Sequence, residues 1–243
     1  MRLRVTDPGQ GRGGSWPLAG LCILGGPILR LAGFALLLGL YRWLMATHST
    51  RVVSGLVIGG CVVLVFPAVW VGRRLLDADP TLGHATRLTL VVHYALMLLI
   101  GAAIVEAVQT GRAWRGWVLP IPEPVGLALL RVTAVATLLT VVNLALRGLG
   151  APCAVALSRR LATDWMYRWT RNPMVLATLA CLLSFGVWIQ SLFFVLWVLV
   201  LVAPAWLVFL KLYEERELEI RFGAPYLSYR ARTSLLLPWK PRT

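Results

Sequence analysis

The sequence predicts an all-helical integral membrane protein with about six transmembrane helices. Of its 243 residues, 58% are hydrophobic and only 14% are charged, and the mean hydropathy is +0.75. Soluble chains carry about a quarter charged residues, and a run of about 20 apolar residues is long enough to span a bilayer. Several runs here reach that length. This composition excludes disordered, collagen-like and disulfide-rich secreted proteins.

Four apolar segments occupy residues 17–147, after a basic N-terminal tail at 1–16. The first runs from 17 to 41 and is interrupted by Arg30. We expect it to be a retained helix, because no convincing signal-peptidase site follows it. The next three predicted spans are 52–72, 88–109 and 124–146. The second segment has no charged residue and the others hold one each, so all remain apolar enough to cross a membrane.

The last apolar block, 173–210, contains no charged residue over 38 positions. A single helix of that length would extend about 57 Å, whereas the hydrocarbon core is about 30 Å thick. The block must therefore fold back, and glycine, serine and glutamine residues place the turn between Ser184 and Ser191. We expect helices five and six to form a hairpin, followed by a cytosolic helical tail. Residues 148–243 are then one region containing loop, hairpin and tail.

The basic residues indicate which way the chain faces. Of the 24 Lys and Arg residues, 18 lie in the tails and in the loops on the side of the termini, and four lie in the opposite loops. Positively charged loops stay in the cytoplasm, so both termini are expected there. This topology accounts for the net charge of +14 without a nucleic-acid partner. The four cysteines, Cys22, Cys61, Cys153 and Cys181, form no pair or cluster with metal-site spacing, so we expect no metal.

Two polar segments flank the predicted hairpin and should meet at the cytosolic face. They are 167–174, before helix five, and 214–219, after helix six. Pro173 suits the first turn of a helix, and Asn172 can cap it. The functional chemistry is therefore expected at this face.

The charges of these segments suit a small zwitterion. A helix N-terminus beside Arg168 and Arg171 favours a carboxylate, and Glu214 and Glu215 favour a cation. Each segment taken alone has a plainer interpretation. The arginines could be ordinary membrane anchors, and the glutamates could be the solvated face of a tail helix.

The residues of the two segments together resemble the isoprenylcysteine carboxyl methyltransferase-like integral membrane methyltransferases, which are related to phospholipid methyltransferases. The matching residues are Tyr167, Arg168, Arg171, Asn172, Pro173 and Met174, then Glu214 and Glu215, then Phe222, Gly223, Tyr226, Tyr229 and Arg230, and finally Leu237 and Pro238. Their order and spacing fit over residues 158–239, about a third of the chain.

The resemblance implies S-adenosylmethionine as methyl donor, bound at the cytosolic ends of the last helices. The positions equivalent to the family's cofactor contacts are Arg159, Arg160, Leu161, Ala162, Tyr167, Asn172, Pro173, Met174, Val175 and Glu214. The basic helix mouth adds Arg168 and Arg171, and the glutamate pair adds Glu215. The methyl acceptor is expected to be a lipid, a prenylated group or another lipophilic molecule that enters from the bilayer.

Several positions depart from the family pattern. Trp165-Met166 stands where Gly-Pro or Gly-Val is usual, Val175 replaces a tyrosine and Ala177 replaces a glycine. Leu210 occupies the position where the carboxyl methyltransferase branch has a substrate-binding arginine. These departures leave the cofactor half of the site in place and weaken the case for a prenylcysteine carboxylate.

The acceptor decides whether a general base is needed. A carboxylate needs none, whereas an amine or hydroxyl does, and the intramembrane candidates are His93 as base and Asn143 as its orienting partner. A histidine on an apolar face is more often a packing residue. Two other functions stay open: an NADPH-dependent membrane reductase of the sterol reductase type, and a non-catalytic scaffold or transporter.

Overall fold

All regular structure in the described part of the chain is helical. The computed structural model describes residues 51–113, 117–148 and 160–240, with scattered helical residues between 31 and 47. Within these ranges the only β-type pairing is one isolated bridge between Val118 and Ser191. The all-helical prediction is thereby confirmed there. Most of the expected first span, 17–41, lies outside the described residues.

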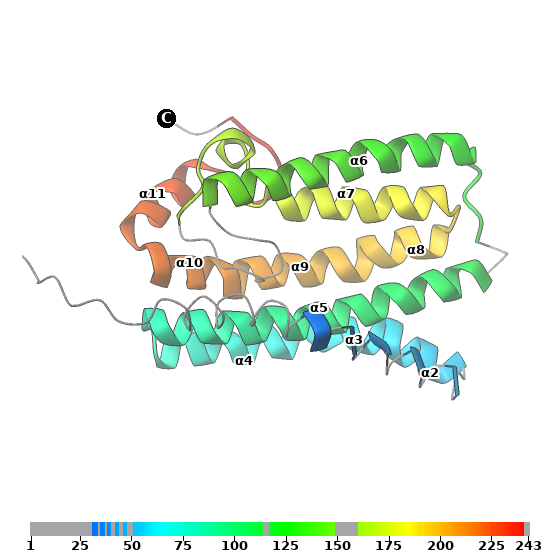
Figure 1. Ribbon diagram of the computed structural model, residues 1–243, viewed down its shortest axis with the longest axis horizontal. Coiled ribbons are helices and arrows are strands. Elements are labelled where there is room, and N and C mark those ends of the chain that lie inside the picture. The colour runs from blue at the N-terminus through cyan, green and yellow to red at the C-terminus, as the bar shows by residue number, and fades with distance from the viewer. Residues whose placement is uncertain are drawn as a thin grey trace, which may run out of the picture.

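The helices form an elongated bundle whose long members run roughly side by side (Figure 1). In chain order the elements are α2 (Arg51–Gly55), η1 (Leu56–Gly60), α3 (Cys61–Val63), α4 (Val65–Ala78), α5 (Leu82–Ala113), α6 (Glu123–Asn143), η2 (Leu144–Gly148), η4 (Trp165–Arg168), α7 (Pro173–Trp188), α8 (Leu192–Trp197), η5 (Val198–Val202), α9 (Ala203–Phe209), η6 (Leu210–Glu214), α10 (Glu215–Phe222) and α11 (Ala224–Arg232). Several of these join end to end, so α2 to α4 make one continuous rod and α8 to α10 another.

Within the residues that the structure describes, four rods are long and apolar enough to cross a membrane. They are Val53–Ala78, Leu82–Gly111, Glu123–Leu146 and Leu192–Phe222. The apolar helix α7, at 16 residues, is shorter. Three of the predicted spans fall inside these rods, but the rods extend further, because the charged residues beyond each apolar run continue the helix instead of ending it. The chain is an integral membrane protein.

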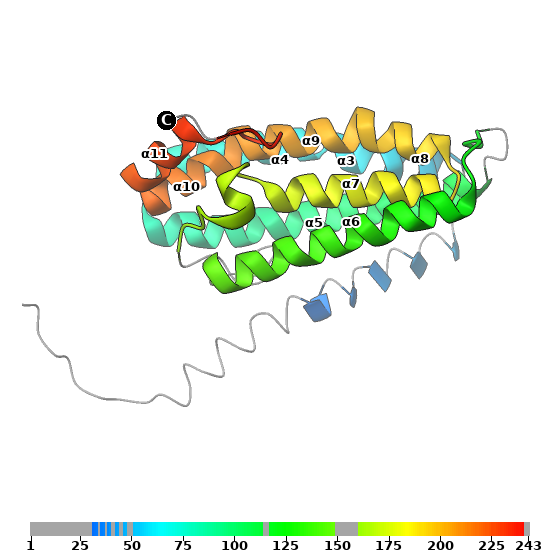
Figure 2. The same cartoon turned by 90° about the horizontal axis from the view of Figure 1, so that it is seen from above.

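The uncharged block is broken between α7 and α8. Helix α7 ends at Trp188, and α8 begins at Leu192 with the Ser191 hydroxyl accepting a hydrogen bond from the Phe194 N–H at 3.2 Å. Gln190 takes a positive φ of 54°, which reverses the chain. The loop between α5 and α6 is hydrogen-bonded to this turn, because the Leu192 N–H donates to the Trp117 carbonyl at 3.0 Å. In both views α7 lies between α6 and the α8–α9 rod (Figures 1 and 2).

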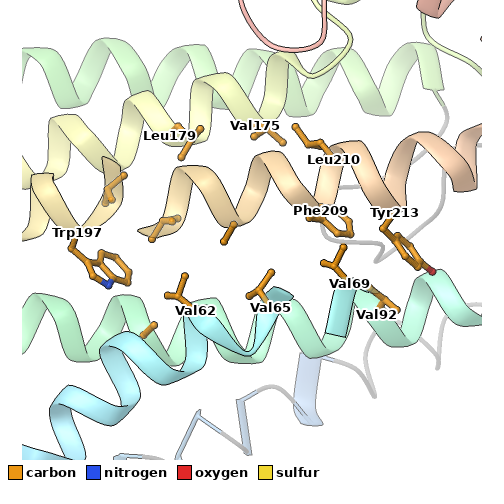
Figure 3. Close-up of a cluster of buried hydrophobic side chains, with 14 of the residues drawn as sticks. Val62, Val65, Val69, Val92, Val175, Leu179, Trp197, Phe209, Leu210 and Tyr213 are labelled. Carbon is orange, nitrogen blue, oxygen red and sulfur yellow. The ribbon is translucent and has the colours of Figure 1, made fainter. Parts of the chain in front are cut away.

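The buried core lies between the α3–α4 rod, α5 and the α9 end of the last rod. Figure 3 shows Val62, Val65 and Val69 facing this last rod, where Phe209 and Tyr213 are buried. The outward faces remain apolar: Val132 and Leu138 of α6 are 68% and 61% exposed. Large exposed apolar faces on a helical bundle are what a lipid environment requires.

Four short π-helical segments interrupt the rods: η1, η2, η5 and η6. A π-turn holds one more residue than an α-turn, with hydrogen bonds from residue i to i+5. In η6 the Glu215 N–H donates to the Leu210 carbonyl, five residues back. Such a turn changes the face that all later side chains of the helix present.

Candidate functional site

A pocket opens at the end of the bundle where α7 begins, beside the end of α6 and helices α10 and α11 (Figure 1). It encloses about 720 Å³ of empty space, including solvent at its mouth. The lining residues are Leu144, Arg160, Leu161, Ala162, Tyr167, Arg171, Asn172, Met174, Val175, Leu210, Glu214, Glu215, Leu218, Phe222, Tyr226 and Tyr229.

Most of the cofactor-binding residues predicted from the sequence line this pocket. They are Arg160, Leu161, Ala162, Tyr167, Arg171, Asn172, Met174, Val175, Glu214 and Glu215. Arg168 does not, because it lies exposed at the end of the short turn η4, and Pro173 is buried in the first turn of α7 without reaching the pocket. Arg159 lies outside the described residues.

The segment before α7 is held by the C-terminal tail. The Arg171 N–H donates to the Ser234 carbonyl at 2.9 Å, and the Trp239 N–H donates to the Trp169 carbonyl at 3.0 Å. The Tyr229 hydroxyl donates to the Tyr167 carbonyl at 2.5 Å. Residues far apart in the sequence thus form one wall of the pocket.

The prediction that Asn172 caps α7 is wrong. Its side chain makes no hydrogen bond to the helix. Instead its amide Nδ2 donates to the Leu235 carbonyl at 2.9 Å, beside the Thr170 hydroxyl, which donates to the same carbonyl at 3.2 Å. The hydrogen bond to the tail fixes the orientation of the amide, and in that orientation the Asn172 side-chain oxygen accepts no hydrogen bond from the first turn of α7.

A turn with positive φ precedes the motif. Trp165 has φ 54°, a left-handed conformation that glycine adopts without strain and a bulky residue rarely does. This is the position where the sequence pattern of related methyltransferases has glycine. A glycine at position 165 would therefore adopt the observed backbone conformation without strain.

Arg171 is already paired across the pocket wall. Its Nη2 donates to the Glu215 carboxylate at 2.5 Å and its Nη1 to the Arg230 carbonyl at 2.9 Å. The two charged side chains are only 11% and 18% exposed, so they neutralise each other largely away from water. Arg160, which is exposed, is the pocket-lining cation for which the described residues offer no partner.

Glu214 differs from the other glutamates of its cluster. Glu215 pairs with Arg171, Glu217 with Arg221, and Glu219 with Arg216 and Arg230. Within the described ranges the Glu214 carboxylate, which lines the pocket, has no hydrogen-bond or ion-pair partner. The cluster therefore presents one carboxyl group without a partner, and that group lines the pocket.

Two tyrosines beside this carboxylate stay protonated. Burial, and next the Glu214 carboxylate, raise the pKa of Tyr167 above its ordinary value. Burial, and next the Glu215 carboxylate, raise the pKa of Tyr226. Both line the pocket as neutral phenols, which can donate or accept hydrogen bonds.

The model of the phospholipid methyltransferase family matches residues 125–224. This stretch runs from α6 to the first residue of α11 and contains both polar segments of the pocket. Residues 125–224 are a domain of the phospholipid methyltransferase family. The resemblance drawn from the motifs is confirmed at this level, and it supports a membrane methyltransferase. No curated protein and no solved structure matches the chain.

The two residues considered for acid–base chemistry, His93 and Asn143, do not line this pocket. His93 Nδ1 lies 2.9 Å from the Thr89 carbonyl one turn back, and its ring meets Phe209 edge-on at 5.1 Å. These contacts are those of a packing residue. Asn143 is fully buried, and neither polar atom of its amide has a partner among the described residues.

The apolar half of the pocket was not predicted from the sequence. Leu144 begins η2 directly after α6, and Leu218 and Phe222 follow Glu214 at intervals of four residues. The interval is a signal of a shared helix face that the sequence already contains. It went unused because the charges around these residues suggested a solvated tail helix.

Proposed function

We propose that this protein transfers the methyl group of S-adenosylmethionine to a lipophilic acceptor that reaches the pocket from the bilayer. The observation that carries the proposal is the Glu214 carboxyl group, which has no partner among the described residues and lies in a pocket that nine other predicted cofactor-binding residues also line. When bound there, S-adenosylmethionine supplies a methyl group already activated by its sulfonium. The protein then has to align the acceptor with that group and exclude water.

The charges of the pocket fit the proposed cofactor. Its ammonium and sulfonium are cationic, and Glu214 offers them an unpaired carboxylate. The carboxylate of S-adenosylmethionine can pair with the exposed guanidinium of Arg160, because Arg171 already pairs with Glu215. The neutral phenols of Tyr167 and Tyr226 supply further hydrogen-bonding groups. In this scheme the Arg171–Glu215 ion pair stabilises the wall of the pocket, and the residues around it bind the cofactor.

The acceptor side of the pocket favours an uncharged or cationic lipophilic group. Leu210 is almost completely buried and lines the pocket, together with Leu144, Met174 and Val175. None of these side chains can pair with a carboxylate. The described residues that line the pocket include no histidine. If the acceptor nucleophile loses a proton, water or a pocket carboxylate therefore has to take it.

We also propose that six spans place both termini and the pocket at the cytosolic face. The 18 to four bias of basic residues supports this orientation. Helix α7, at 16 residues, extends about 24 Å, close to the thickness of the hydrocarbon core. The stretch 17–41 supplies the remaining span in this arrangement.

Calorimetric titration of the detergent-purified protein with S-adenosylmethionine tests the proposal. NADPH is titrated as the competing ligand. Glu214→Gln removes the unpaired carboxyl group, which can ionise beside a cationic ligand, and is expected to weaken S-adenosylmethionine binding by about tenfold or more. Glu219→Gln is the matched control, since Glu219 belongs to the same cluster but does not line the pocket, and it should bind with nearly wild-type affinity.

Each other outcome of the titration has a definite meaning. Binding of NADPH alone would support a reductase. Binding of neither ligand would favour a non-catalytic scaffold. Equal weakening in both glutamate variants would show that the cluster acts through general charge, and the assignment of Glu214 would then be withdrawn.

A further inference from the structure

Four pocket-lining residues of the last rod are spaced at regular intervals of four: Leu210, Glu214, Leu218 and Phe222. In an uninterrupted α-helix each such step turns the side chain by about 40°, so Phe222 would point about 120° away from Leu210. An uninterrupted helix could not direct all four into one pocket. Something in the rod restores their alignment.

The π-helical segment η6 provides the alignment. It spans Leu210–Glu214 and holds one residue more than an α-turn would. One extra residue turns the rest of the helix back by about 100°, which leaves Phe222 only about 20° from Leu210. Figure 3 shows Leu210 pointing toward Val175 of α7, whereas Phe209 and Tyr213 point toward α4 and α5. The π-turn therefore sets which residues face the pocket.

Residues of α4 contact the π-turn directly. A carbonyl within the turn, that of Leu212, accepts a hydrogen bond from Nη1 of Arg73 at 3.0 Å. The neighbouring Gly72 leaves room for the ring of Tyr213, because a Cβ at position 72 would lie 2.9 Å from that ring. The Tyr213 hydroxyl lies 3.2 Å from the Thr89 hydroxyl of α5.

Arg73 is itself held in place by charge. Its Nε donates to Asp77 Oδ2 at 2.7 Å, and Asp77 Oδ1 accepts from Arg216 Nε at 2.8 Å, just beyond η6. Arg73 thus contacts the middle of the π-turn, and Asp77 contacts the first helical turn after it. Neither residue lines the pocket, and both lie outside the stretch matched by the family model.

We propose that Arg73 is a positioning residue for the pocket, which keeps the π-turn formed and so keeps Glu214, Leu218 and Phe222 directed into it. The identity of the ligand rests on the proposed function, but the alignment of the helix does not. Loss of the Arg73 hydrogen bond should let the rod relax toward a continuous α-helix. Molecules in that relaxed state present a different face to the pocket.

The test compares Arg73→Gln with Arg74→Gln. Arg74 is the neighbouring arginine of α4, and its guanidinium stacks over Trp70 at 4.8 Å and does not reach the π-turn. Two quantities are measured: the affinity for S-adenosylmethionine, and the rate at which a water-soluble maleimide labels Leu218→Cys in a background with the four native cysteines changed to alanine. Thermal unfolding of each unliganded variant is recorded in parallel.

A single population should govern both quantities. If the pocket-facing arrangement falls to about a tenth of the molecules, S-adenosylmethionine affinity and labelling rate both fall about tenfold in Arg73→Gln. In Arg74→Gln both should stay at their wild-type values. A merely structural role would lower the melting temperature without moving the labelling rate at temperatures where the variant is folded.

The outcomes separate this inference from the proposed function. Altered labelling in Arg73→Gln with no S-adenosylmethionine binding by the wild type would retain the inference and overturn the proposed cofactor. Unchanged affinity and labelling in Arg73→Gln would overturn the inference. Should Arg73→Gln fail to fold, deletion of the exposed Lys211 removes the extra residue directly. An unchanged rate of maleimide labelling of Leu218→Cys in that deletion background would equally overturn the inference.

Discussion

At the scale of single residues, the pocket differs from its surroundings in one carboxyl group that has no ion-pair or hydrogen-bond partner among the described residues. Arg171 and Glu215 satisfy each other, and so do Glu217 and Arg221, at 2.6 Å. Glu214 has no such partner among the described residues, and it lines the pocket. The motif located Glu214, but it could not tell which glutamate is unpaired, because pairing depends on where α10 and α11 place their arginines.

Trp165 offers a test of the backbone at the mouth of the site. Its φ of 54° suits glycine, and a side chain there costs about 1–2 kcal/mol. Replacement by either Gly or Ala removes the indole, so the difference between the two variants reports the backbone alone. We expect Trp165→Gly to be more stable than Trp165→Ala by about 1 kcal/mol. Urea unfolding in detergent measures the difference, and a more stable alanine variant would contradict the left-handed turn.

At the scale of helices, the positions of the apolar spans could be predicted from the sequence. The direction in which each helix points its side chains could not. The runs at 52–72, 88–109 and 124–146 each became part of a long rod, because apolar residues in such numbers have only a helical solution in lipid. The π-turns could not be predicted. Whether Leu210–Glu214 takes the extra residue depends on Arg73 and Gly72, which are more than 130 positions away in the sequence.

The contact between α6 and α7 is predicted to depend on Gly126. A Cβ there would lie 2.6 Å from the Trp188 Cα, so even alanine forces the two helices apart. We expect Gly126→Ala to lower the free energy of unfolding by about 1–3 kcal/mol. Gly83→Ala is the control, since a Cβ at that exposed position of α5 meets nothing within 4 Å, and it should be neutral or slightly stabilising. Equal effects in the two variants would mean that α6 and α7 do not pack this closely.

At the scale of the whole molecule, the pocket lies at one end of the bundle, where most of the positive charge also lies. The end of α4, the start of α7 and the helices α10 and α11 all meet there (Figures 1 and 2). The asymmetry of basic residues was readable from the sequence because it depends only on loop order. The meeting of the tail with α7 was suggested by the motifs and rests on main-chain hydrogen bonds that no motif encodes.

This end of the bundle is expected to face the cytosol, which single cysteines can test. In a background with the native cysteines changed to alanine, Thr81→Cys marks the loop between α4 and α5, and Pro120→Cys marks the loop before α6; both positions are exposed. In intact cells an impermeant maleimide should label Pro120→Cys and spare Thr81→Cys. Labelling of Thr81→Cys alone would show that the protein has the opposite orientation in the membrane. Thr6→Cys extends the test to the first apolar stretch: six spans require it to be protected like Thr81→Cys, and external labelling would show that residues 17–41 do not add a crossing.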